Sequence, residues 1–163
     1  MGNVRNLQEL GNNLQKIVRR LMENENLLKY LYYTDKDPLA NPNLTPAQKK
    51  TEVFEKLIKV VPLVGAQDLV TSILVLRVAS GNLNENSEFE DIDIAIESFV
   101  PLSQWKIKGE NLRPFAIMGE VQKSLNNKEV NGLGKMINHG FALNFMTEEI
   151  SAYVQPFRII SYS

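Results

Sequence analysis

Cysteine is absent from this chain of 163 residues, and histidine and tryptophan occur once each. Without cysteine there is no disulfide, no thiol nucleophile and no thiolate ligand for a metal. The one histidine, His139, has no second histidine or cysteine with which to complete a metal site or a nucleophile pair, so we interpret it as a strand or turn residue. The redox compartment stays open, because proteins of any compartment can lack cysteine.

A surplus of charge of one sign is also missing. The chain has 18 Lys and Arg residues against 19 Asp and Glu residues, for a formal net charge of −1. This balance creates no positive field that would gather nucleic acid or an anionic membrane, so we expect neither as a directly bound partner. No apolar run approaches the roughly 18 residues of a membrane-spanning helix, and polar residues interrupt every turn of segment 1–20. The sequence predicts a soluble protein without a signal segment.

The composition that is present is that of a folded domain. Hydrophobic residues make up 44% of the chain and charged residues 23%, which is ordinary for globular proteins. The length suits one hydrophobic core. We predict a single domain over 1–163, with an N-terminal helical segment 1–33, a Pro-rich loop 34–46 and an α+β core 47–163.

Helical periodicity occurs in three segments. Over 4–33 apolar residues recur at steps of three and four, and Asn24 offers a point where the helix stops and is capped again. Thr45 and Gln48 fit a capping box around Pro46, which predicts a short helix there. That helix would turn four apolar residues inward, Val53, Phe54, Leu57 and Ile58. A strand over 59–64 is the competing interpretation.

The third helix is predicted over 111–125, opened by Pro114. Its apolar side would hold Leu112, Phe115, Met118, Val121 and Leu125.

A long hairpin is predicted over 69–100. Segment 69–79 is dense in Val, Ile and Leu, and segment 88–100 alternates apolar and acidic residues, with residues 80–86 as the open tip. At about 3.3 Å per residue each arm could reach about 35 Å, against a radius of gyration of about 15 Å for a compact chain of this size. We therefore expect part of the hairpin to project.

The C-terminal part predicts two more strands, 134–146 and 150–162, joined at 147–149. Pro156 would place the last strand at a sheet edge or beside a bulge. Hairpins interrupted by a helix predict an α+β fold with a mainly antiparallel sheet, helices packed on one face and an N-terminal helix.

The sharpest chemical signal is acidic. Residues 82–97 carry six carboxylates and no Lys or Arg. Asp91 and Asp93 stand two apart on a strand, where they would share a face and could hold a divalent cation. This resembles the acidic strand of nucleotidyltransferases, but those enzymes also need a Gly-Ser turn before that strand, and Ser80 and Gly81 come in the reverse order. A solvated strand edge that resists aggregation is the simpler interpretation.

A basic cluster on the first helical segment has a similarly plain interpretation. Arg5, Lys16, Arg19 and Arg20 lie on its polar side, and a solvated face is favoured there over contact with nucleic acid. No catalytic constellation remains, so we predict that the chain is not an enzyme.

Several stretches together resemble a tail-terminator or head-to-tail connector protein from the neck of large contractile-tailed bacteriophages. They extend over most of the chain from Asn26 to Phe145, and their joint order carries the resemblance. The stretches are Asn26 to Leu39, Asp91 to Ile94 with Val100 to Trp105, Leu112 to Met118, and Asn131 to Gly134. The predicted order of elements is also similar to that of tail terminators.

The resemblance implies a structural virion protein without a cofactor or metal. In tail terminators six copies form a ring that caps the tail tube, stops its growth and joins it to the head. The implied partners are copies of the chain in a hexameric ring, the tail tube, the sheath and neck or connector proteins. DNA would pass through the lumen without specific binding, and the location would be the virion tail or neck after synthesis in the host cytoplasm.

A ring of this kind suggests a role for the acidic hairpin. A long hairpin can continue a sheet into the next subunit, and acidic residues facing a channel would let DNA slide. We predict that four residues lie at a subunit boundary or face the lumen, Glu88, Glu90, Asp91 and Asp93. Terminator, adaptor and another neck ring are open alternatives, as are a monomeric or dimeric regulatory adaptor and a metal-dependent nucleotidyltransferase or nuclease that uses Asp91 and Asp93.

Overall fold

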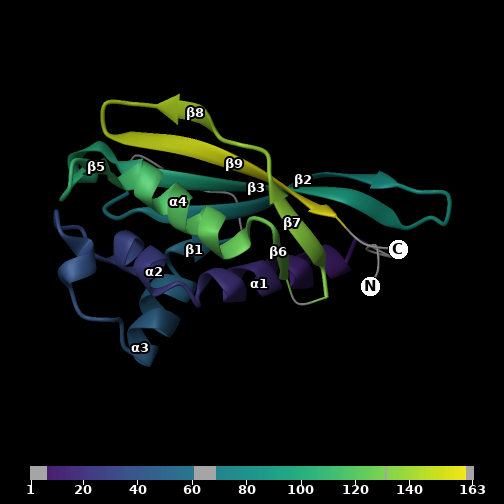
Figure 1. The fold of residues 1–163 in the computed structure, drawn as a ribbon, viewed down its shortest axis with the longest axis horizontal. Helices are drawn as coiled ribbons and strands as arrows, with labels where there is room; N and C mark the ends of the chain where they lie inside the picture. Colours follow the sequence, from purple (N-terminus) through teal and green to yellow (C-terminus); the bar gives the residue numbers. More distant parts are fainter. Residues whose placement is uncertain (1–6, 61–68, 131, 161–163) are drawn as a thin grey trace.

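The computed structural model describes residues 7–60, 69–130 and 132–160 (Figure 1). Its helices are α1 (Glu9–Leu21), α2 (Glu25–Tyr32), α3 (Pro46–Gln48), which continues as a π-helical segment over Lys49–Phe54, and α4 (Arg113–Leu125), with 3-10 turns at Pro38–Ala40 and Leu102–Gln104. Its strands are β1 (Ile58–Lys59), β2 (Ile73–Leu83), β3 (Phe89–Pro101), β4 (Lys106–Ile107), β5 (Asn111–Leu112), β6 (Lys128–Val130), β7 (Gly134–Asn138), β8 (Ala142–Met146) and β9 (Ile150–Ile160). Within these ranges no helix has the length and apolar character needed to cross a membrane.

One seven-stranded sheet organises the fold. Its order is β1-β2-β3-β9-β7-β6, and β8 pairs with β9 on the side that β7 also uses. All neighbours are antiparallel except β1 and β2, which are parallel. The helices pack on one face, with α1 against β2 and α4 against β3 and β7 (Figure 1). The predicted α+β fold, with its mainly antiparallel sheet, is confirmed.

The core lies between this sheet and the helices. Ile94 and Ile96 of β3 and Phe157 of β9 face Ile17 of α1 and Ile117 of α4, and all five are at most 2% exposed. Burying a side chain of this size contributes about 1.5–3 kcal/mol to folding. The core therefore fixes the central strands and leaves the distal part of the hairpin outside it.

The N-terminal helical segment is in two pieces, as the sequence predicts. The side-chain oxygen of Asn24 accepts a hydrogen bond from the Leu27 amide (3.0 Å), which caps α2. The Asn24 amide group donates to the Ser124 hydroxyl (2.9 Å) and to the Glu120 carbonyl (3.2 Å) of α4. The Asn24 side chain therefore begins the second helix and ties it to α4, while the Asn24 backbone amide donates to the Leu21 carbonyl at the end of α1 (3.1 Å). Predicted helical residues 4–6 lie outside the described residues.

The capping box at the start of α3 is present. The Thr45 hydroxyl accepts from the Gln48 amide (3.2 Å), and the Gln48 side chain accepts from the Thr45 amide (2.9 Å). The inward position of Phe54 was wrong, because Phe54 is 36% exposed whereas Val53 is fully buried. The wider π-helical winding of 49–54 displaces the side chains from their α-helical positions. The predicted strand over 59–64 is seen only as β1, since 61–64 lie outside the described residues.

The hairpin reaches further than its predicted strands. β2 continues to Leu83, so the turn is shorter than residues 80–86 and spans 84–88. In Figure 1 its distal half extends well past the helices at one end of the molecule, and β2 is exposed or half-buried from Arg77 onward. The predicted projection is confirmed.

Phe115 was predicted to lie on the inward side of α4, and this prediction was wrong. The buried residues of that face are Ile117, Val121 and Leu125, with Met118 beside them, and Phe115 is 39% exposed. Phe115 packs instead against the ring of Tyr153, 5.3 Å between centroids, at the margin of the sheet. The α-helical period places it outside the stripe that Ile117 begins.

The predicted strand 134–146 is broken into β7 and β8. Residues 139–141 make no strand pairs, and Gly140 has a φ of 95°, which only glycine adopts readily. Positions 161 and 162 of the predicted last strand lie outside the described residues.

The prediction of an edge position for Pro156 was also wrong, since β9 has β3 on one side and β7 and β8 on the other. The Pro156 carbonyl accepts from the His139 amide (2.9 Å). The missing N–H of the proline therefore points into the gap where the partner of β9 changes from β7 to β8.

Candidate functional site

Two adjacent bulges shape the projecting hairpin. Ala79 is an extra residue in β2, between the pairs Val78–Ile94 and Ser80–Asp93. Asp91 and Ile92 then stand opposite the single Gly81, and Asp91 has a φ of 51°. A Cβ on Gly81 would lie 2.6 Å from the end of the Ile92 side chain, so glycine is what lets Ile92 cross this position. Bulges increase the local twist of a ribbon, which turns the distal half away from the plane of the sheet.

The bulge also breaks the alternation between the two candidate metal ligands, Asp91 and Asp93. Asn82 pairs with Glu90 and Ser80 pairs with Asp93, so Glu90 and Asp93 share a face although they are three residues apart. Asp91 occupies the extra position between them, and the simple alternation that would place Asp91 and Asp93 together is lost. In the described ranges no group of three or more His, Asp or Glu side chains could hold a metal ion.

Asp93 is engaged by an arginine from the neighbouring strand. Arg158 of β9 donates from Nε to one carboxylate oxygen (2.8 Å) and from a terminal nitrogen to the other (3.0 Å), and the Ser80 hydroxyl adds a third bond (3.1 Å). The Arg158 hydrogen bonds hold the pKa of Asp93 below its ordinary value, although burial opposes this. Both carboxylate oxygens of Asp93 are therefore occupied by hydrogen bonds to neighbouring strands of the sheet.

Glu97 is neutralised in a similar way further along β3. Its carboxylate is 3% exposed, Arg77 of β2 donates to it at 2.7 Å, and Asn144 of β8 donates to its other oxygen. Of the acidic run 82–97, the two carboxylates nearest the centre of the sheet, Asp93 and Glu97, are thus paired with arginines. The carboxylates of Glu85, Glu88, Glu90 and Asp91 lie in the distal half, beyond these two pairs.

The tip carries apolar surface beside these carboxylates. The Asn84 side chain accepts from the amides of Asn86 (2.9 Å) and Glu88 (3.0 Å) and so closes the turn. Directly behind it Leu83 and Phe89 form a cross-strand pair, and Leu83 is 61% exposed. We call residues 83–90 the acidic tip. A projecting segment with an exposed Leu and a partly exposed Phe is typical of a protein contact.

A second surface lies between α1 and the α3 segment. A shallow hollow of about 380 Å³ is formed by three cationic side chains and three apolar ones. We call it the basic groove, and its lining residues are Arg19, Met22, Pro46, Lys49, Lys50 and Phe54. The exposed ring of Phe54 belongs to this lining, which explains its outward position.

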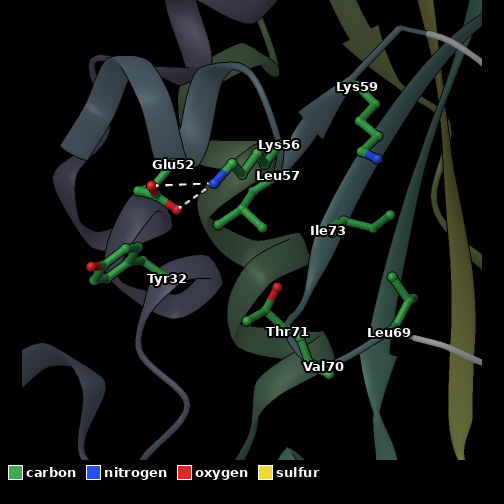
Figure 2. A pocket seen from close by; sticks show the side chains of 9 residues that line it. All are labelled: Tyr32, Glu52, Lys56, Leu57, Lys59, Leu69, Val70, Thr71 and Ile73. Atoms are coloured by element: carbon green, nitrogen blue, oxygen red, sulfur yellow. Dashed lines mark hydrogen bonds and ion pairs between the residues drawn. The ribbon is translucent and has the colours of Figure 1, made fainter. Parts of the chain in front are cut away.

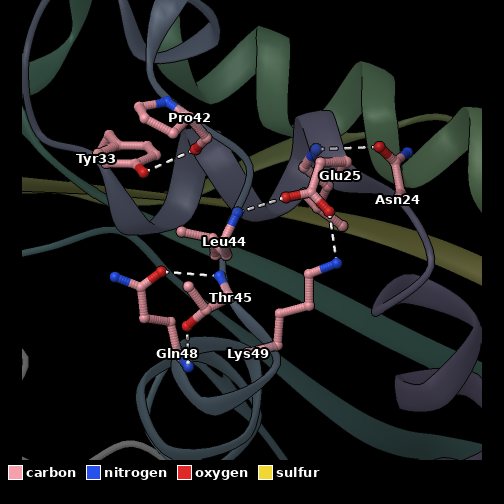
Figure 3. Close-up of polar contacts among 9 residues, drawn as sticks. Asn24, Glu25, Tyr33, Pro42, Leu44, Thr45, Gln48 and Lys49 are labelled. Carbon is pink, nitrogen blue, oxygen red and sulfur yellow. Dashed lines mark hydrogen bonds and ion pairs between the residues drawn. The ribbon is translucent and has the colours of Figure 1, made fainter.

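A polar network holds the basic groove in place (Figure 3). Glu25 accepts from the Leu44 amide (2.9 Å) and forms an ion pair with Lys49 (2.7 Å), which connects the start of α2 to the π-helical segment. Burial alone would raise the pKa of Glu25, but the Lys49 and Leu44 hydrogen bonds together lower it. The Tyr33 hydroxyl donates to the Pro42 carbonyl (2.8 Å) and fastens the intervening loop.

A separate cavity of about 330 Å³ lies between α2, the end of the π-helical segment and β2 (Figure 2). Tyr32, Leu57 and Ile73 give it an apolar lining, and the Glu52–Lys56 ion pair (3.1 Å) stands at one side. The residues that line this cavity do not form a pair of a hydroxyl or thiol nucleophile and an adjacent base. We assign no chemistry to this cavity.

An apolar patch covers the margin of the sheet above α4. Phe115, Phe141 and Tyr153 form a ring cluster with centroid separations of 5.3–6.2 Å. Phe141 is 60% exposed, and Leu143 and Met146 of β8 are about half exposed. Exposed apolar side chains of this number on neighbouring elements indicate a surface that contacts another protein.

Sequence reasoning found the hairpin but neither the groove nor the patch. Arg19 was interpreted as part of a solvated face, and Phe54 was assigned to the core. No local pattern signals the groove, because Arg19 and Met22 are distant in sequence from Lys49, Lys50 and Phe54 and meet them only in the fold.

A comparison with known proteins gives one family. A family model described as YomW matches residues 24–155 of the chain, from the start of α2 into β9. It includes the acidic hairpin, the π-helical segment and α4. No curated protein matches the chain.

Proposed function

The chain belongs to the YomW family, and from this premise we propose that it is a structural virion protein that closes into a ring at the head-tail junction of a phage. The family match points to a phage-associated protein. Capping of the tail tube and attachment to the neck, as in tail terminators, are the specific role that we propose. The projecting acidic hairpin is the observation that carries the proposal.

The distal half of this hairpin contributes little to the stability of an isolated monomer. Its distal half adds exposed Leu83 and four carboxylates but few core contacts, and its twist directs it away from the molecule. An element that ends in apolar surface outside its own core contributes stability mainly when another chain covers it. Head-to-tail contact between copies through such an arm closes into a ring when the rotation per subunit divides a full turn.

The distribution of carboxylates fits a channel or a subunit boundary. Glu88, Glu90 and Asp91 extend past the cation pairs that neutralise Asp93 and Glu97. In a ring, such carboxylates near the lumen would repel the phosphates of passing DNA and prevent binding through counterion release. An assembled structure with Glu88, Glu90, Asp91 and Asp93 all on the outer surface and away from neighbours would contradict this placement.

The apolar patch offers a further contact for the ring. Phe141 and Leu143 lie on β8 and the loop before it, away from the tip. A subunit that sits between the tail tube and the neck needs surfaces for neighbours other than its own copies. We assign the apolar patch to one of these neighbours, the tail tube, the sheath or a neck protein.

Native mass spectrometry and negative-stain imaging over a range of concentrations test the proposal. We expect the chain to form a closed ring, alone or with the tail-tube protein of the same phage. A variant in which an Asn-Gly turn replaces residues 83–89 keeps the hydrogen-bonded pair Asn82–Glu90 and the bulge. It should stay folded and fail to close the ring. A wild-type chain that remains monomeric at high concentration and with tube protein present would overturn the proposal.

A further inference from the structure

We propose that the basic groove of one subunit receives the acidic tip of the next. This inference rests on the proposed function and names the surfaces that join the ring. The tip presents exposed Leu83 beside Phe89, which is half-buried and also packs against the core, with Glu85, Glu88 and Glu90 next to them in sequence. The groove presents apolar Met22, Pro46 and Phe54 surrounded by Arg19, Lys49 and Lys50. Each surface supplies what the other lacks.

The charges that are available favour this pairing. Arg19 and Lys50 are both exposed, and neither forms an ion pair with any residue in the described ranges. Lys49 is held by Glu25, which keeps its ammonium at the groove wall. Glu55, which follows Phe54, lines an adjoining hollow and not the groove, and among the described residues Glu25 is the carboxylate that pairs with a groove cation, Lys49. Arg19 and Lys50 leave the lining with a net positive charge, so an acidic segment is attracted and a basic one repelled.

The apolar components match in kind as well. Phe54 is 36% exposed at the groove, and Leu83 is 61% exposed at the tip. Covering both removes apolar surface from water, which contributes about 25 cal/mol per Å². Aromatic and Met side chains at the centre of a contact with charges at its rim are the usual anatomy of a specific protein interface.

The two surfaces cannot meet within one subunit. In Figure 1 the hairpin tip lies at one end of the molecule, and α3 lies near the opposite end, so their separation in space is at least as large as it is in the picture. A tip must therefore enter the groove of another copy. The contact joins different surfaces of the two chains, so its head-to-tail repetition generates a ring or an open filament, whereas a reciprocal exchange of tips between two copies would stop at a two-fold dimer.

Charge reversal tests the pairing. Arg19→Glu with Lys50→Glu changes the groove, and Glu85→Lys with Glu90→Lys changes the tip. We expect each pair of substitutions to raise the concentration for half-assembly by roughly tenfold or more. The chain that carries all four should assemble again, and an equal mixture of tip-reversed and groove-reversed chains should also form rings. Lys106→Glu with Lys128→Glu, two exposed lysines of β4 and β6, is the matched control and should assemble normally.

Crosslinking gives a second, independent readout, because the chain has no cysteine of its own. With Ser87→Cys at the turn and Lys50→Cys in the groove, mild oxidation should yield covalent oligomers up to the closed ring. Either substitution alone should yield dimers at most.

The outcomes separate this inference from the proposed function. Rings that form normally with a reversed groove, together with an absence of covalent oligomers, would overturn the tip-to-groove contact and leave the ring itself in place. A wild-type chain that never assembles would overturn both. Restoration of assembly by the fourfold variant supports the contact directly.

Discussion

Arg113 begins α4 and is among the largest side chains of the described chain that are completely buried. Its guanidinium donates to the carbonyl oxygens of Tyr30 (2.7 Å), Tyr33 (2.8 Å), Asp35 (2.6 Å) and Gln104 (2.9 Å). Burial lowers the pKa of Arg113, but a guanidinium stays charged at neutral pH. One side chain thus closes the end of α2 and the following loop onto α4.

Arg113→Met should lower the free energy of unfolding by about 3 kcal/mol, because one buried and three partly buried carbonyls lose charged donors. Arg113→Lys should recover only part of the loss, since one ammonium cannot reach all four oxygens in the fork geometry of Arg. Urea denaturation followed by circular dichroism measures both. Equal stability of Arg113→Met and the wild type would show that the carbonyls find other partners.

Asp93 and Arg158 predict a pH dependence on the acid side. The Arg158 hydrogen bonds lower the folded-state pKa of Asp93 below its unfolded value of about 3.9. The pair therefore stabilises the fold fully above that pH, and this contribution is lost as the pH falls through the folded-state pKa. Asp93→Asn should cost about 1 kcal/mol at pH 7 and flatten the stability profile below about pH 4.

The measurement is the urea midpoint across pH 2 to 7. Arg158→Gln should give the same flattening, because it removes the same pair. A variant profile parallel to that of the wild type would contradict the assignment. Neither residue was linked to the other from the sequence, since positions 93 and 158 meet only through the register of β3 and β9.

At the scale of elements, Asn24 shows how one residue joins three helices. Asn24→Ala should lower the free energy of unfolding by about 1–2 kcal/mol, because it removes the cap of α2 and the bonds to α4. Asn24→Ser keeps an acceptor for the Leu27 amide but is too short to reach Ser124. We expect it to lie between Ala and the wild type in thermal or urea unfolding. A Ser variant as unstable as Ala would mean that the bonds to α4 carry all of the effect.

Elements with a clean period were predictable from the sequence, as was the helix break at Asn24, and interruptions within the strands were not. The alternation of apolar and acidic residues around Ile94 predicted the hairpin, and the capping residue Asn24 predicted the break between the first two helices. The bulge at Asp91 was missed because a left-handed backbone in a non-glycine residue has no distinct sequence signature there. Of the two positions predicted for Pro156, the sheet edge is wrong, and the interruption beside it is a change of neighbour from β7 to β8, which the sequence did not reveal.

At the scale of the whole molecule, assembly should weaken with salt. The tip and groove meet through exposed charges, and at about 1 M salt the Debye length falls to about 3 Å. We expect the concentration for half-assembly, measured by light scattering, to rise as salt increases. The fourfold charge-reversed variant should show the same dependence. Assembly that strengthens with salt would instead mean that apolar burial dominates the contact.

The candidate site was only half visible in the sequence for a related reason. The acidic tip is one continuous segment and could be found by counting charges. The groove is assembled from Arg19 and Met22 of one helix and Lys49, Lys50 and Phe54 of another. Their proximity depends on the Glu25–Lys49 ion pair and on the path of the loop between α2 and α3, which local patterns do not reveal.

Pro156 marks a gap on one side of β9, with β7 paired to β9 before the gap and β8 paired to it beyond the gap. β7 is hydrogen-bonded on both sides, by β6 and by β9, whereas β8 is bonded to β9 alone among the described strands. Because Pro156 has no N–H to donate, the ladder loses one hydrogen bond at the gap and keeps the one from the His139 amide to the Pro156 carbonyl, so β8 can fray without loosening β7. Amide deuterium uptake should therefore be faster over 142–146 than over 134–138, and the strand that carries Leu143 and Met146 of the apolar patch would be the part of the sheet most able to adjust to a neighbour.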